Sequence, residues 1–80
     1  MELKQEFVEV IARIKSDGSV RPLSLIYQGR PFEIDKLKYI TPRAASKAGG
    51  TGVRYSIVVS GRDCFLYEDE GRWWVERKVQ

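Results

Sequence analysis

RYSIVVSGRDCFLYEDEGRWWVE, residues 54–76, carries the pattern that decides the fold of this 80-residue chain. Apolar and polar residues alternate in three runs, over 53–60, 63–68 and 72–79. A turn with a glycine separates each run from the next, first at Gly61 and then at Gly71. Alternation with a period of two between glycine turns is typical of antiparallel hairpins, so this stretch predicts a three-stranded sheet.

Three further alternating runs precede this stretch, over 7–15, 20–28 and 31–40. Asp17-Gly18 is a strong hairpin signal between the first two runs, and Gly29 marks the next tight turn. Pro22 has no backbone N–H, which places the second run at a sheet edge, at least near its start.

The third of these runs changes phase part-way along. Leu37 and Ile40 do not continue the alternation that precedes them, so we expect a bulge or bend near Asp35-Lys36. Small sheets often curl into barrels at such points. The chain therefore predicts an all-β fold, a six-stranded small barrel or a strongly bent antiparallel sheet, joined mainly as a meander.

The segment 42–52, PRAASKAGGTG, breaks the pattern because it contains no large apolar residue. We expect a mobile loop at about 42–52 within a single domain that spans 1–80. Glycine-rich backbone can cradle phosphate, but Gly52 is followed by a strand, whereas a P-loop leads into a helix. Arg43 and Lys47 make the loop positive, so they are the candidate anion-contacting residues.

The composition narrows the possible functions. The chain is 42% hydrophobic and 31% charged with a formal net charge of +3, which fits a folded domain and permits an acidic partner or nucleic acid. It has no histidine and one cysteine, Cys64. A disulfide, a Ser-His or Cys-His nucleophile pair and a structural zinc site within the chain are thereby excluded. We expect no enzyme activity, no cofactor and no metal.

The sequence also favours a cytoplasmic protein. A small secreted domain usually contains several cysteines. The first residues hold no apolar run long enough for a signal peptide, and no stretch is long enough to span a membrane.

Hairpin register decides where the two adjacent tryptophans point. A two-residue turn at Gly61-Arg62 and an even-length turn around Glu70-Gly71 collect seven residues on one coherent core face: Tyr55, Ile57, Val59, Cys64, Leu66, Trp73 and Val75. Trp74 then lies on the opposite face. The alternative is a three-residue turn over 69–71, which leaves no face cleanly apolar. Coherence favours the even-length turn.

The opposite face is the candidate binding face, and it joins aromatic and basic residues: Phe65, Tyr67, Trp74, Arg72, Lys78 and Arg54. Three interpretations stay open. The aromatics form a second core beneath the loop or the N-terminal strand. They form a protein interface, where Trp, Tyr and Arg are enriched. Or they stack on the bases of single-stranded nucleic acid. We expect a non-enzymatic binding or assembly module, by protein–protein contact or self-association, with weak nucleic-acid binding as the alternative. An exposed edge strand is a further possible contact.

Two stretches, PLSLIYQGRPFEI (22–34) and RYSIVVSGRDCFLYEDEGRWWVE (54–76), resemble a group of small bacterial β domains without an established activity. The shared pattern is a proline, an alternating run, Gly-Arg, a second run and a tyrosine-rich hairpin that ends in Gly-x-Trp. The resemblance implies a compact SH3-like or similar barrel in a bacterial cytoplasm. The chain lacks the aromatic and acidic loop pattern of proline-peptide binders, so that function is not implied.

Overall fold

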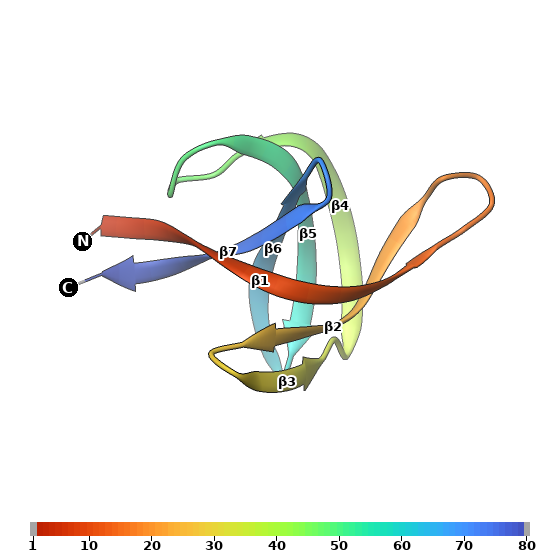
Figure 1. The fold of residues 1–80 in the computed structure, drawn as a ribbon, viewed down its shortest axis with the longest axis horizontal. Coiled ribbons are helices and arrows are strands. Elements are labelled where there is room, and N and C mark those ends of the chain that lie inside the picture. Colours follow the sequence, from red (N-terminus) through yellow and green to blue (C-terminus); the bar gives the residue numbers. More distant parts are fainter. Residues whose placement is uncertain (1, 80) are drawn as a thin grey trace.

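The computed structural model describes residues 2–79 as one curled antiparallel sheet of seven strands (Figure 1). The strands are β1 (Glu2–Ile14), β2 (Val20–Tyr27), β3 (Arg30–Glu33), β4 (Lys36–Ala45), β5 (Thr51–Val59), β6 (Arg62–Asp69) and β7 (Arg72–Val79). Their order in the sheet is β3-β2-β1-β7-β6-β5-β4. The predicted all-β class is confirmed, while the predicted count of six strands is one too few.

The extra strand arises where the bend was expected. The third run is divided by Ile34 and Asp35 into β3 and β4, the two edge strands of the sheet. The Ile34 N–H donates to the Leu23 carbonyl at 2.9 Å, and the next N–H, of Asp35, donates to Val58 at 2.8 Å. Because Leu23 belongs to β2 and Val58 to β5, this link brings the two ends of the sheet together and curls it into a half-barrel.

β1 belongs to both halves of the curled sheet. Residues 2–8 pair with β7, and residues 9–14 pair with β2. The other neighbouring strands are joined by consecutive hairpins, so the predicted meander is correct apart from this pairing of the first strand with the last. Beyond the barrel, the β1–β2 hairpin projects as an arm (Figure 1).

The main core lies inside the curl. Leu25, Tyr55, Ile57 and Leu66 are buried there, and Trp73 packs against them with its ring 5.2 Å from that of Tyr55. Burial of these apolar side chains on a single face is the main stabilising term of the fold.

The β5–β6 turn differs from the prediction by one residue. It is Ser60-Gly61, with φ of 51° and 76°, which is the two-residue hairpin geometry that favours glycine. Ile57 therefore pairs with Cys64 instead of Leu66. Because the register moves by two residues, each side chain keeps its predicted face.

The β6–β7 turn is Glu70-Gly71, with φ of 49° and 80°. Tyr67 pairs with Trp74 and Glu68 with Trp73. The even-length turn is confirmed and the three-residue alternative is wrong, so Trp73 and Trp74 lie on opposite faces of the sheet.

Candidate functional site

Tyr67 and Trp74, the centre of the predicted binding face, form a second core. Their rings stack 5.5 Å apart with an interplanar angle of 8°, and the residues are only 2% and 3% exposed. Phe7 meets the Trp74 ring edge-on at 5.9 Å, and Ala44 of β4 completes the cluster. A partner therefore cannot reach the two stacked rings while this cluster stays closed.

The cover comes from the β4–β5 hairpin. Residues 42–45 and 51–52, which were expected in a loop, are strand ends, and the turn is confined to 46–50. Gly52 makes the close approach possible. A Cβ at that position would lie 2.6 Å from the Glu68 carbonyl oxygen and 3.0 Å from the Trp74 ring. The small residues that suggested a loop are the residues that let this hairpin lie on the aromatic face.

Polar contacts hold the tip of this hairpin in place. The Glu76 carboxylate accepts hydrogen bonds from the Ser46 hydroxyl at 3.1 Å and from the Ala48 N–H at 3.2 Å. The Trp74 indole N–H donates to the Ser46 hydroxyl at 3.4 Å, and the Gln5 side chain donates to the Gly49 carbonyl at 2.8 Å. The tip is thus attached to both β1 and β7.

Burial also changes the acid–base behaviour of the stacked pair. It raises the pKa of Tyr67 above its ordinary value, and the nearby Glu76 carboxylate raises it further because phenolate would be a second negative charge. The ring is therefore held as the neutral phenol, which suits a structural role in a dry cluster.

The other predicted site residues are exposed except Arg54, which is half-buried, and two of the arginines stack on aromatic rings at separate places. Phe65 is 41% exposed, and the Arg54 guanidinium lies 4.5 Å above its ring. Arg72 instead lies 4.1 Å above the ring of Phe7. Lys78 is exposed on β7, and Arg43 and Lys47 are exposed on the β4–β5 hairpin. The Tyr67–Trp74 pair lies between the two cation–aromatic groups, in the cross-strand row formed by Arg54, Tyr67, Trp74 and Phe7.

A cleft of about 340 Å³ lies beside Phe65. Tyr39, an exposed aromatic that sequence reasoning did not select, lines it together with Ser56, and an ion pair between Lys38 and Asp63 at 3.1 Å lies at its rim. Cross-strand pairing places Phe65 and Tyr39 on either side of Ser56. Tyr39 escaped notice because the bulge in β4 shifts the alternation there.

A second exposed group, on the outer face of β1 and β2, was not predicted. Phe7, Ile11 and Ile26 are 48%, 62% and 38% exposed, and we call them the apolar strip. The signal in the sequence was weak, because in FVEVIARI both alternating sets of positions contain apolar residues.

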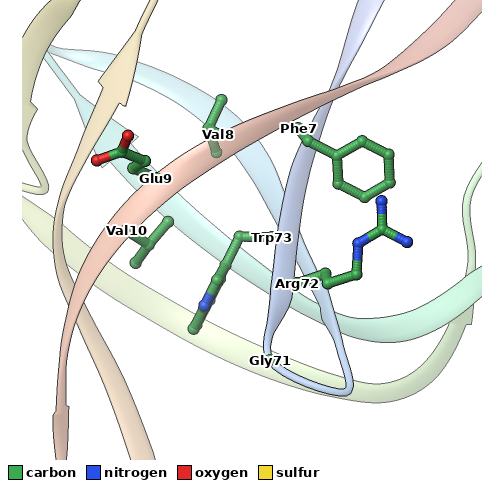
Figure 2. A pocket seen from close by; sticks show the side chains of 7 residues that line it. All are labelled: Phe7, Val8, Glu9, Val10, Gly71, Arg72 and Trp73. Atoms are coloured by element: carbon green, nitrogen blue, oxygen red, sulfur yellow. The ribbon is translucent and has the colours of Figure 1, made fainter.

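A surface cavity of about 490 Å³ borders the strip where β1 leaves β7 to join β2 (Figure 2). Figure 2 shows the Phe7 ring and the Arg72 guanidinium side by side, and Val10 and Trp73 also line the cavity. Glu9 also lines the cavity, on the other side of β1 from Phe7 and Arg72 in Figure 2, so the lining includes an aromatic ring, a cation and a carboxylate.

Within residues 2–79 there is no cluster of three or more Cys, His or acidic side chains with metal-binding geometry. The same part of the chain contains no helix that is long and apolar enough to cross a membrane. Comparison of the chain with protein-family models, curated protein sequences and solved structures finds no match.

Proposed function

We propose that this chain is a non-enzymatic binding module that docks onto a protein surface, with a second copy of the chain as its first partner, through the apolar strip. The exposure of Phe7, Ile11 and Ile26 on one outer face carries the proposal. Large apolar side chains that gather on the surface of a small soluble domain mark interaction sites. The lack of histidine in the sequence supports a binding role over catalysis.

The apolar strip is a better candidate for the binding surface than the aromatic face that the sequence predicted. Tyr67 and Trp74 are used for stability, whereas Phe7 keeps half of its surface open beside the cavity. Aromatic and arginine side chains are the groups most enriched at binding hot spots, and here Arg72 lies on Phe7.

The charges beside the strip favour a second copy. Glu9 and Arg72 both line the cavity beside the strip. A two-fold axis through the strip would place Glu9 of each copy opposite Arg72 of the other, which is the self-complementary pattern of an isologous dimer. A cytoplasmic location and kinship with SH3-like barrels belong to the same proposal.

Sedimentation velocity over a hundredfold range of protein concentration tests this proposal. We expect the weight-average mass of the wild type to rise with concentration, and the Ile11→Lys variant to stay monomeric. Ile40→Lys is the matched control because Ile40 is an exposed isoleucine on β4, away from the strip. A wild type that stays monomeric throughout, or an Ile11→Lys variant that associates like the control, contradicts self-association through the strip.

The Phe65 cleft favours a second candidate function, binding of single-stranded nucleic acid. Two exposed aromatics, Phe65 and Tyr39, flank the cleft, and Arg54 covers one of them. Bases stack on such rings while arginine contacts phosphate. Fluorescence anisotropy with a labelled oligothymidine would then show affinity that falls steeply with salt. Phe65→Ala should lose that affinity and Phe7→Ala should keep it, and equal binding by both variants would contradict this assignment.

A further inference from the structure

The ladder between β6 and β7 ends after three residue pairs. Tyr67 pairs with Trp74, Glu68 with Trp73 and Asp69 with Arg72, and no pairing follows although both strands continue. β6 extends back to Arg62 and β7 extends on to Val79. Figure 1 shows β7 running away from β6 alongside β1. A wedge therefore opens between residues 62–66 and 75–79.

Strand alternation identifies which backbone groups face this wedge. Residues that flank a two-residue hairpin turn form a hydrogen-bonded pair, and such pairs recur at every second position. Val59 and Arg62 flank the β5–β6 turn, so Arg62, Cys64 and Leu66 direct their backbone groups toward β5. Asp63 and Phe65 then direct their N–H and C=O groups to the other side, into the wedge.

The same reasoning applies to β7. Asp69 and Arg72 flank the β6–β7 turn, so Arg72, Trp74, Glu76 and Lys78 direct their backbone groups toward β6. Beyond Trp74 no β6 residue is paired with them. Within residues 2–79, the backbone groups of Asp63, Phe65, Glu76 and Lys78 form no turn or side-chain hydrogen bond either. The wedge is thus bordered by two free strand edges that face one another.

The wedge leads to an apolar groove of about 350 Å³. Three side chains from the β2–β3 hairpin, Leu25, Tyr27 and Phe32, line it. Val59 of β5 and Val75 of β7 line it as well. Free edges above an apolar floor are the two features that bind an extended peptide, because backbone bonds hold the strand and pockets accept alternate side chains.

Some of the charged side chains near the groove have partners within the chain and others do not. Asp63 pairs with Lys38 at 3.1 Å, the Glu76 carboxylate binds Ser46 and Ala48, and Arg77 pairs with Glu6 at 2.6 Å. Among the described residues, Arg62 and Lys78 form no ion pair. The Glu76 carboxylate keeps its negative charge in those hydrogen bonds, so the net charge along the wedge is only slightly positive. Arg62 and Lys78 are the groups that complement a segment carrying acidic residues.

We propose that the wedge between β6 and β7 is a strand-addition site for an extended peptide with apolar residues at every second position and acidic flanks. The site goes beyond the dimer surface proposed above and does not depend on it, because the apolar strip lies on β1 and β2. A peptide of about five residues spans the free edges, since a strand rises about 3.3 Å per residue.

Amide hydrogen exchange with a synthetic peptide tests the site. The probe is DVTVTVD, blocked at both ends, and its control is DVPVPVD, which keeps the valines and the charges but lacks N–H groups along one edge. In the free protein we expect Asp63, Phe65, Glu76 and Lys78 to exchange fast. When DVTVTVD fills about 90% of the sites, hydrogen exchange of these amides should be about tenfold slower. DVPVPVD should leave their exchange fast.

Charge reversal supplies an independent check. Arg62→Glu with Lys78→Glu should weaken binding of DVTVTVD about tenfold. The matched control is Arg13→Glu with Arg21→Glu on the projecting β1–β2 hairpin, which changes the net charge equally and should leave affinity unchanged. Ile11→Lys, which should abolish self-association, should also leave peptide binding unchanged, so the two proposals fail separately.

Several results would overturn the site. Slow exchange of the four amides in the free protein would mean that the wedge is closed. If protection of these amides from exchange grows with protein concentration in the absence of peptide, the wedge binds a second copy of the chain instead. Equal binding of DVPVPVD, or equal weakening by the two charge-reversal pairs, would show that neither the free edges nor the rim charges recognise the peptide.

Discussion

Replacing Trp74 by alanine should lower the free energy of unfolding more than replacing any other aromatic residue on the outer face of the sheet. The residue lies on the outer face of the sheet, yet only 3% of it is exposed. The substitution removes the stack on Tyr67, the edge contact with Phe7 and the indole bond to Ser46 in one step. The cavity that remains is covered by the β4–β5 hairpin, which loses its main apolar contact.

The expected size follows from burial. Truncation of a buried tryptophan costs about 3–5 kcal/mol in the free energy of unfolding. A chain of 80 residues has a total stability of about 4–12 kcal/mol at the usual 0.05–0.15 kcal/mol per residue. Trp74→Ala therefore removes between a quarter and all of it. Phe65→Ala is the matched control, since Phe65 is a half-exposed aromatic on the same face, and it should cost no more than about 1 kcal/mol.

Urea unfolding followed by circular dichroism measures both variants. The Trp74→Phe variant separates the two contributions, because it keeps a ring for the Tyr67 stack and removes the indole N–H. Loss of that N–H should cost about 1 kcal/mol and lower Tm by about 4–8 °C. A loss below about 1 kcal/mol for Trp74→Ala, or an equal loss for Phe65→Ala, would refute the second core and restore the outer face as an open aromatic surface.

Three other changes test the same region. Gly52→Ala should cost about 1–3 kcal/mol in urea unfolding, because the new methyl group would lie 2.6 Å from the Glu68 carbonyl oxygen, and a neutral result would contradict the close approach. Glu76→Ala should speed amide exchange of Ala48, whose N–H donates to that carboxylate, and unchanged exchange would show that the contact does not hold the hairpin. Burial raises the pKa of Tyr67, so its contribution to stability is complete below about pH 10, where the unfolded phenol begins to ionise, and is lost as the pH rises further. The urea midpoint should thus fall above about pH 10, and the Tyr67→Phe variant should show a smaller fall.

The sequence was sufficient for the strands and their faces because those depend on local features. Alternation and the Glu70-Gly71 turn placed Trp73 and Trp74 on opposite sides, as observed. The turn at Ser60-Gly61 was missed by one residue without changing a face, because the register moved by two. The division into β3 and β4 appeared in the sequence only as a break in the apolar–polar alternation. Such a break predicts a bend but does not show whether one strand or two result.

The burial of Trp74 could not be predicted in the same way because it depends on a contact between distant segments. Ala44, Ser46 and Gly52 are small, and small residues without periodicity are typical of loops. The same smallness lets a backbone approach an aromatic ring, but only the three-dimensional path of the hairpin shows which meaning applies. The exposed strip was missed for a related reason, since the change of neighbours along β1 determines which of its apolar residues remain uncovered.

The second core and the open wedge meet at one residue. Had the β6–β7 ladder continued, the backbone of Glu76 would pair with that of Phe65, and β7 would stay beside β6. Instead β7 follows β1, and the Glu76 side chain binds the tip of the β4–β5 hairpin while its backbone groups face the wedge. A domain of this size has too little interior to bury all its aromatics in one core, so covering the outer face adds apolar burial that the curl cannot supply. The divergence that places Glu76 beneath the hairpin is the same divergence that frees the strand edges, and stability and binding capacity therefore have a common structural origin.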